Sequence, residues 1–213
     1  SSKSAILINY DDCSVLYEKN ADLVLPMAST TKIMTALVAA ESMPLSAKVS
    51  IPKEAVGIEG SSVYLTEGEI FTLEELLCCT LLESANDAAT AVAIAVSGSI
   101  EDFAVLMNEK CAELGLVDTH FTNPHGLDDD EHYTTARELG IIAAAALEND
   151  ALRKIFSTYK MTVAAPDGGV RLLINHNRLL KSIEGCIGVK TGYTKSNGRC
   201  LVSAAERNGL RLI

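Results

Sequence analysis

The sequence is short of basic residues and contains no tryptophan. Its 213 residues include 18 Lys and Arg against 28 Asp and Glu, which gives a formal net charge of −10. Because binding to phosphates needs a basic surface, this charge argues against a nucleic acid as partner. An anionic substrate would need a local cluster of Lys or Arg set against the overall negative field.

Long hydrophobic runs are also absent. The longest, residues 88–96, is roughly half the length that crosses a bilayer. No signal-peptide pattern is visible at the N-terminus, which reads as part of a mature domain. Because a leader could have been removed, the N-terminus does not define the compartment.

Cys-x-x-Cys pairs are missing, and the six cysteines show neither a disulfide framework nor the spacing of zinc ligands. We expect most of them to be free, buried thiols that behave as small hydrophobic side chains. They are Cys13, Cys78, Cys79, Cys111, Cys186 and Cys200.

Hydrophobic residues make up 48% of the chain, enough for a full core. Apolar periodicity predicts helices in the middle of the chain, at residues 30–42, 72–82, 86–97, 99–115 and 135–149. Short β-rich runs between turn residues predict strands at both ends, at residues 4–10, 14–19, 159–165, 170–176, 187–192, 199–206 and, through an Asn-Gly turn, 207–213. Capping boxes are predicted at Thr72–Glu75 and Thr135–Glu138, and an N-cap at Ser99.

Strands at both ends and helices between them indicate an α+β fold. We expect one mostly antiparallel sheet whose first hairpin meets the last strands, flanked by helices and joined to a helical insertion. Residues 1–213 then form a single domain, with a sheet lobe at about 1–28 and 150–213 and a helical lobe at about 29–149.

The Ser29–Lys32 pair is the first candidate for chemistry. A serine hydroxyl becomes a good nucleophile when a neighbouring base takes its proton, and residues i and i+3 share one face of a helix. Ser-x-x-Lys is common, however, and also occurs at 50–53 and 157–160. The Pro52 in the second pair disfavours helical geometry, and the third pair leads into a predicted strand.

Two further motifs favour a catalytic role for the Ser29–Lys32 pair. Ser84 and Asn86 form a Ser-x-Asn element, and Lys190, Thr191 and Gly192 form a Lys-Thr-Gly element. Taken singly, Ser84 reads as a helix N-cap and Lys190 as an exposed strand end. Together the three motifs stand in the order found in penicillin-binding proteins and class A β-lactamases.

The whole chain resembles the serine D-alanyl-D-alanine carboxypeptidases, which are low-molecular-mass penicillin-binding proteins of the β-lactamase/transpeptidase-like family. Besides the three motifs, the similar segments are 5–37, 123–140 and 185–213. The resemblance implies an exported enzyme of the bacterial cell envelope that needs no cofactor or metal. Its substrate would be a peptidoglycan stem peptide ending in D-Ala-D-Ala, and β-lactam antibiotics would acylate it.

The resemblance also implies roles for the motif residues. Ser29 would be the nucleophile and Lys32 its base, which must be neutral; burial and the second cation Lys190 favour the neutral form. Ser84 would relay a proton to the leaving amine, and Asn86 would hold the substrate amide and orient Lys32. The backbone N–H groups of Ser29 and Tyr193 would form the oxyanion hole. Lys190, Thr191 and Gly192 would line the subsite for the substrate's terminal carboxylate.

Two departures from the family pattern stand out. Where some members place an arginine between two asparagines to meet the substrate carboxylate, this chain has His176, so His176, Arg178 or Arg199 is expected to serve. The family domain also continues beyond residue 213 with the rest of a strand and a helix, and many members add a membrane-binding helix. We therefore expect membrane contact only through segments outside this chain, and an open sheet edge that allows a dimer.

Alternative functions remain at this stage. A serine β-lactamase shares the three motifs but uses an additional glutamate for deacylation, and no Glu-x-x-x-Asn element lies between Asn86 and Lys190. A non-catalytic penicillin-sensing or wall-binding module is the other alternative. The histidines at 120, 125 and 132 lack metal-ligand spacing, so no metal is expected there. The acidic run 128–131 is expected to be a solvated loop, with calcium as the alternative.

Overall fold

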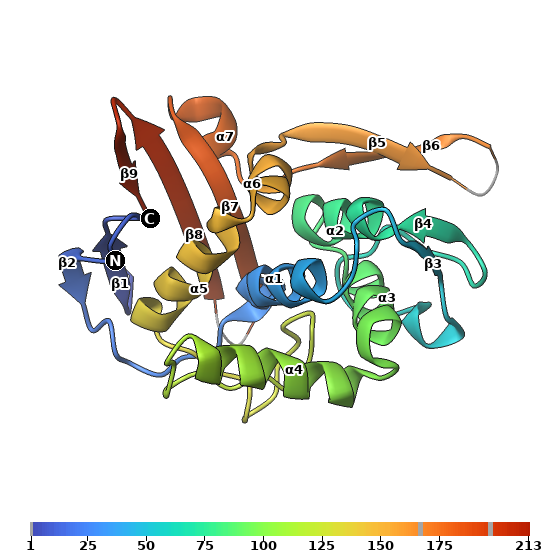
Figure 1. Cartoon of the computed structure of the whole chain (residues 1–213), viewed down its shortest axis with the longest axis horizontal. Helices are drawn as coiled ribbons and strands as arrows, with labels where there is room; N and C mark the ends of the chain where they lie inside the picture. Colours follow the sequence, from blue (N-terminus) through green and yellow to red (C-terminus); the bar gives the residue numbers. More distant parts are fainter. Residues whose placement is uncertain (1, 166–167, 196–197) are drawn as a thin grey trace.

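The structure is a computed structural model that describes residues 2–165, 168–195 and 198–213 (Figure 1). Its strands, in chain order, are β1 (Ala5–Ile8), β2 (Val15–Lys19), β3 (Lys48–Ser50), β4 (Ile70–Thr72), β5 (Lys160–Ala164), β6 (Val170–Ile174), β7 (Cys186–Thr194), β8 (Gly198–Arg207) and β9 (Leu210–Leu212). The α-helices are α1 (Lys32–Ser42), α2 (Leu73–Leu82), α3 (Asn86–Ser97), α4 (Ile100–Glu113), α5 (Ala136–Glu148), α6 (Asp150–Ser157) and α7 (Leu179–Ser182). Two 3-10 turns, η1 (Ala28–Thr31) and η2 (Lys53–Ala55), precede α1 and follow β3.

The described strands pair antiparallel throughout, as the sequence predicts. Strands β7, β8 and β9 pair in that order in a three-stranded sheet, and the Asn208–Gly209 turn joins β8 to β9. Ile8 and Ile213 exchange backbone hydrogen bonds of 2.9 and 3.0 Å, so the β1–β2 hairpin meets the end of β9. This contact confirms the predicted meeting of the first hairpin with the last strands, and it brings both ends of the chain to one side of the molecule (Figure 1).

The β3–β4 and β5–β6 hairpins differ from the expected single sheet, because each is a separate two-stranded unit. β3 and β4 have only three residues each, too few for an alternating pattern to be read. The helices α6 and α7 were also not predicted. Asn149 caps α6 through hydrogen bonds from Ala151 and Leu152, and an Asn cap of this kind was available in the sequence.

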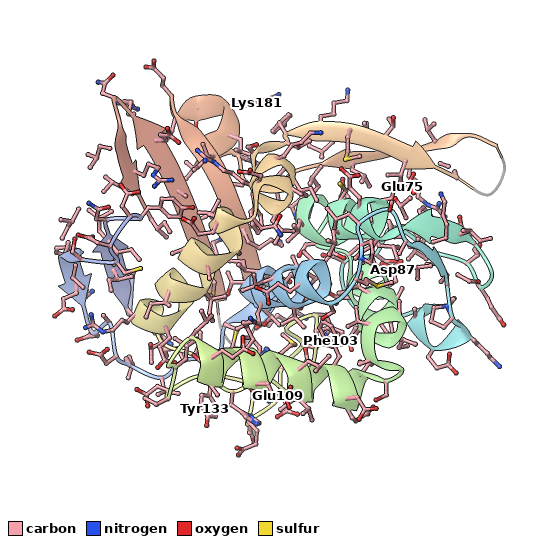
Figure 2. All side chains as sticks on the ribbon, in the orientation of Figure 1. Glu75, Asp87, Phe103, Glu109, Tyr133 and Lys181 are labelled. Atoms are coloured by element: carbon pink, nitrogen blue, oxygen red, sulfur yellow. The ribbon has the colours of Figure 1, made fainter. Side chains whose placement is uncertain are left out.

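The core lies around α1. Every residue from Lys32 to Ala39 is buried, because α1 contacts α2, α3, α4 and α5 on its different sides. Figure 1 shows α1 at the centre, with α5 and α6 crossing one face of the β7–β8 sheet. Phe103 lies between α4 and α1 and is fully buried, whereas Glu109 on the same helix points outward (Figure 2). The Lys32 side chain at the start of α1 is therefore enclosed by protein on all sides.

Two of the predicted helix starts are confirmed. Thr72 and Glu75 form a reciprocal capping box, and Ser99 accepts from the Asp102 N–H. The third differs from the prediction: Thr135 accepts from the Glu138 N–H, but the Glu138 carboxylate turns away from the cap. It accepts instead from the N–H groups of Val117 and Asp118 and from the Thr119 hydroxyl. Glu138 therefore ties α5 to the loop before it.

The six thiols are free, as predicted, although only Cys78, Cys79 and Cys111 are buried. Burial raises the pKa of Cys78 and of Cys111 to about 12, so both stay protonated at neutral pH. In the described ranges no single helix is long and apolar enough to span a bilayer. The pair α3 and α4 passes that test only jointly, with a bend of 82° between them.

Candidate active site

Ser29 lies in the 3-10 turn η1, and Lys32 follows as the first residue of α1. The turn is held by hydrogen bonds from the Thr30 hydroxyl to the Met27 carbonyl (2.6 Å) and from the Thr31 hydroxyl to the Ala28 carbonyl (2.8 Å). In a 3-10 turn the side chains at i and i+3 are eclipsed. The Lys32 Nζ accordingly lies 3.1 Å from the Ser29 Oγ.

The Lys32 side chain is completely buried, and its nitrogen has three oxygen neighbours. Nζ lies 3.1 Å from the Ser29 Oγ, 2.7 Å from the Asn86 Oδ1 and 2.6 Å from the His125 carbonyl oxygen. Burial and the nearby Lys190 lower the pKa of Lys32 well below 10.5, while the Asp87 carboxylate opposes the shift. A neutral amine can donate to Asn86 and His125, and its lone pair then faces the serine hydroxyl. This is the geometry that proton abstraction requires.

Ser84 connects α2 to α3 and adopts a left-handed backbone conformation with φ of +60°. Its Oγ accepts a hydrogen bond of 3.0 Å from the Lys190 Nζ. Lys190 is 1% exposed on β7, and burial lowers its pKa to about 7. Ser84 is not the N-cap of α3, because Ala85 occupies that position. Lys190 is not an exposed strand end, because it lies buried within β7.

Asn86, the first residue of α3, has a fixed amide orientation. Its Nδ2 donates to the Glu59 carbonyl (2.6 Å), and its backbone N–H donates to the Ser61 carbonyl (2.7 Å). Because a carbonyl only accepts, Nδ2 must face Glu59 and Oδ1 must face Lys32. A side chain at residue 60 would clash with this amide, since a Cβ on Gly60 would lie 2.8 Å from Nδ2.

The loop that holds Asn86 is itself held by Asp87. This carboxylate accepts from the Ser62 hydroxyl (2.6 Å) and from the N–H groups of Val63 (3.3 Å) and Leu65 (3.0 Å). Asp87 is 1% exposed, and Figure 2 shows it near one end of α3 among the packed helices. This role was not predicted, although an Asp directly follows the Ser-x-Asn element in the sequence.

The Lys-Thr-Gly element brings β7 against Ser29. A Cβ on Gly192 would lie 3.1 Å from the Ser29 nitrogen and 3.2 Å from the Ala28 Cβ, so a bare backbone is needed for this approach. Gly192 pairs with Cys200 of β8. Thr191 is half-buried and Tyr193 is 64% exposed, on the β7 segment that runs past Ser29.

The Asn-Pro-His-Gly segment, predicted only as a turn, supplies main-chain groups to the site. Its His125 carbonyl accepts from Lys32, and its Pro124 carbonyl accepts from the Thr35 hydroxyl at 2.6 Å. The Asn123 Oδ1 accepts from the Gly126 N–H at 2.7 Å and closes the turn. Every residue type has a backbone carbonyl, so the sequence does not identify which carbonyls serve as acceptors. Only the Asn-Pro pair and the Gly, as turn residues, could have predicted this segment.

The three residues considered for the carboxylate subsite are all exposed. The His176 side chain is 46% exposed, and its Nε2 lies 3.5 Å from a carboxylate oxygen of Glu83. Arg178 is exposed at the N-cap of α7. Arg199 is exposed on β8, in register with Tyr193.

The histidines at 120, 125 and 132 serve local hydrogen bonds. His132 Nδ1 accepts from the Thr122 N–H (3.0 Å), so its Nε2 carries the proton and donates to the Thr31 hydroxyl oxygen, 2.7 Å from Nε2. Burial lowers the pKa of His132 to about 4 and that of His125 to about 3, which keeps both neutral. Among the described residues, no three His, Cys, Asp or Glu side chains are grouped to hold a metal ion.

Known structures share this architecture. An evolved penicillin-binding protein homolog from Mycobacterium tuberculosis superposes with a TM-score of 0.95 and 33% identity, over 99% of this chain and 80% of the other. The DD-transpeptidase of Streptomyces K15 gives a TM-score of 0.92 and 33% identity, over 100% of this chain and 88% of the other. The fold is therefore that of the serine penicillin-binding proteins.

Sequence comparison gives the family. The family model described as D-alanyl-D-alanine carboxypeptidase (Peptidase_S11) matches residues 1–213, and the chain belongs to this family. Relatives include the carboxypeptidase DacF of Bacillus subtilis (39% identity over 100% of this chain and 56% of DacF) and DacB2 of Mycobacterium tuberculosis (36% over 98% and 72%). The chain thus spans between half and three quarters of the length of these two relatives.

Proposed function

We propose that this chain is a catalytic domain of a serine D-alanyl-D-alanine carboxypeptidase. It would have a sheet lobe at about 1–28 and 150–213 and a helical lobe at about 29–149. The observation that supports this function best is the meeting of Ser29 with Lys32 at 3.1 Å and of Ser84 with Lys190 at 3.0 Å. These four groups come from three distant segments of the chain, and Lys190 lies near enough to Lys32 to help lower its pKa.

Acylation begins when the neutral Lys32 removes the proton of the Ser29 hydroxyl. The Ser29 Oγ then forms a bond to the carbonyl carbon between the two terminal D-alanines. The backbone N–H groups of Ser29 and Tyr193 stabilise the negative charge on the carbonyl oxygen. Ser84 passes its hydroxyl proton to the leaving amine as the C–N bond breaks, and it takes a replacement proton from the Lys190 ammonium, which donates to its Oγ at 3.0 Å; D-alanine then departs. Water then hydrolyses the ester and restores the serine.

The terminal carboxylate of the substrate would bind beside the Lys190 ammonium, a local positive charge in an acidic protein. Lys190 and Thr191 line this subsite, Gly192 lets the strand approach, and His176 lies at its edge. Asn86 holds the substrate amide while it orients Lys32. Such a local cationic cluster is what a net charge of −10 demands of an enzyme with an anionic substrate.

The substrate class and location follow from the family. We propose a peptidoglycan stem peptide that ends in D-Ala-D-Ala, and β-lactam antibiotics as covalent inhibitors. The relatives are bacterial enzymes, which supports an envelope location for this chain, on the outer face of the cytoplasmic membrane or secreted. A serine β-lactamase and a non-catalytic binding module are not favoured, because the relatives are named as carboxypeptidases.

We predict that the wild-type chain releases D-alanine from a diacetyl-L-Lys-D-Ala-D-Ala peptide and that Ser29→Ala does not. Ser29→Ala removes the only atom that can form the ester. D-Alanine is measured by a coupled assay, and mass spectrometry of intact protein after penicillin treatment should locate a persistent adduct on Ser29. No release of D-alanine by the wild-type chain would favour the non-catalytic binding module. Fast turnover of nitrocefin would favour the β-lactamase.

We also predict that the 1–213 chain associates in solution through its sheet. A cavity of about 720 Å³ separates β1 from β8 beyond the Ile8–Ile213 contact, so strand edges face an open apolar slot. Strand edges of this kind pair with other chains. Light scattering should therefore give a mass that rises with concentration, and Leu201→Lys on β8 should reduce it. A clean monomer with cooperative melting would contradict the prediction.

A further inference from the structure

His132 is a buried histidine that the proposed mechanism does not use, and both of its ring nitrogens have partners. It is 3% exposed, and its ring lies edge-on to Phe121 with the ring centroids 5.5 Å apart. Nδ1 accepts from the Thr122 N–H at 3.0 Å, and Nε2 lies 2.7 Å from the Thr31 Oγ1. Because a backbone N–H only donates, Nδ1 has no proton and Nε2 carries it. Burial lowers the pKa of His132 to about 4, so the ring holds this single proton at neutral pH.

This tautomer sets the direction of the next hydrogen bond. The Thr31 hydroxyl oxygen receives the His132 Nε2–H, so the hydroxyl proton is left for another acceptor. The Thr31 hydroxyl donates to the Ala28 carbonyl oxygen at 2.8 Å. The opposite tautomer of His132 would take the hydroxyl proton and leave the Ala28 carbonyl without this donor. We call this directed series, from the Thr122 N–H through His132 and Thr31 to the Ala28 carbonyl, the His132 relay.

Ala28 depends on the relay because its backbone conformation is unfavourable. Its φ of +48° lies in the left-handed region, which a residue with a Cβ adopts only when the surrounding structure holds it there. Ala28 is 1% exposed, so its carbonyl depends on a donor from the protein. Gly126 covers the same hydrogen bond, since an added Cβ would lie 2.0 Å from the Ala28 oxygen and 2.8 Å from the Thr31 Oγ1.

The Ala28 carbonyl and the Ser29 N–H belong to one peptide group. This group is planar and trans, so its C=O and N–H point in opposite directions, and holding one of them holds the other. The Ser29 nitrogen lies against β7, because a Cβ on Gly192 would lie 3.1 Å from it. Ser29 is in the first turn, where N–H groups have no acceptor within the helix. The relay therefore sets the direction of one of the two N–H groups assigned to the oxyanion hole.

We propose that His132 positions the oxyanion hole of this site through Thr31 and the Ala28 carbonyl. An oxyanion hole lowers the barrier only when its donors are already aimed at the place where negative charge develops. His132 acts through two other residues, so it is a positioning residue and not a catalytic one. The inference rests on the proposed carboxypeptidase function.

The experiment compares variants that keep the relay with variants that break it. Thr31→Val keeps the shape of the side chain and removes the hydroxyl, whereas Thr31→Ser keeps the hydroxyl. His132→Gln is long enough to carry an amide N–H where Nε2 lies, and His132→Asn carries its amide only at the place of Nδ1. Thr80→Val is the matched control, because the buried Thr80 hydroxyl also donates to a backbone carbonyl, that of Leu76 at 2.8 Å.

Two kinds of measurement are made on these proteins. The values of kcat and KM are measured for D-alanine release from diacetyl-L-Lys-D-Ala-D-Ala, together with the free energy of unfolding in urea. Thr31→Val and His132→Asn should lower kcat by about 10- to 100-fold with KM unchanged, because the oxyanion forms only in the transition state. Thr31→Ser, His132→Gln and Thr80→Val should stay near the wild-type kcat. Nitrogen NMR of the wild-type ring at pH 7 should show a protonated Nε2 and a bare Nδ1.

A purely structural role gives a different result. Thr31→Val and Thr80→Val would then lose stability alike and both keep the wild-type kcat, which would overturn the inference. A rise in KM with unchanged kcat, or a protonated Nδ1 on His132, would also overturn it. If His132→Asn does not fold, Thr31→Val decides, because valine has the shape of threonine. Absence of D-alanine release by the wild-type chain would overturn the proposed function itself, and the nitrogen spectrum would still test the relay.

Discussion

Replacing Lys32 with methionine should slow acylation of Ser29 by about 10²- to 10⁴-fold, the usual contribution of a general base. Methionine fills a similar volume but cannot accept a proton, so the 3.1 Å contact with the Ser29 Oγ loses its function. The measurement is the rate of adduct formation with a fluorescent penicillin, followed by stopped flow. The wild-type rate should rise with pH as Lys32 deprotonates, with a midpoint below 10.5 because burial and Lys190 lower its pKa.

Two further variants separate chemistry from packing. Lys32→Arg keeps the positive charge but cannot become neutral, so it should be as slow as the methionine variant. Lys53→Met alters the lysine of the exposed Ser50–Lys53 pair and should acylate at the wild-type rate. Normal acylation by Lys32→Arg would show that Lys32 acts as a cation and not as a base.

Gly126→Ala should lower the free energy of unfolding by about 3–5 kcal/mol, because strain and overpacking add at this position. Gly126 has a φ of +84°, and an added Cβ would lie 2.0 Å from the Ala28 carbonyl oxygen. The methyl group must push η1 or the Asn-Pro-His-Gly turn away. Urea denaturation measures the loss of stability, and acylation should fall as well, because Ala28 precedes the nucleophile and His125 holds Lys32.

Gly57→Ala separates the two parts of this effect. Gly57 has a similar φ of +76°, but no atom lies within 4 Å of an added Cβ. It should therefore show only the conformational cost, about 1 kcal/mol, with unchanged acylation. Equal losses of stability in the two variants would mean that the contact with Ala28 is not what requires a glycine.

The sequence predicted the side-chain part of the site better than its main-chain part. Ser29, Lys32, Ser84 and Lys190 were predicted from hydroxyls and amines in three ordered motifs. The structure pairs Ser29 with Lys32 at 3.1 Å and Ser84 with Lys190 at 3.0 Å. The carbonyls that hold Lys32 and Asn86 were missed, because any residue type can offer a carbonyl. Their positions depend on turns that only the folded chain brings to α1.

The fold, like the site, was predicted only in part from the sequence. Long helices with caps, such as the one that begins after Thr72, were predicted from local signals alone. The short hairpin β3–β4 was missed because three residues per strand leave no periodicity. Glu138 was predicted to complete a capping box, but a loop twenty residues earlier competes for its carboxylate. A local sequence pattern does not predict such competition between distant hydrogen-bond partners.

The complete burial of Lys32 ties reactivity to folding. In an unfolded chain this amine is hydrated, carries its proton at neutral pH and leaves the neighbouring serine inert. In the folded chain, burial and the nearby Lys190 lower its pKa well below 10.5, which favours the neutral amine. Under the proposed mechanism, the final packing of the interior is therefore what enables Lys32 to act as the base of Ser29.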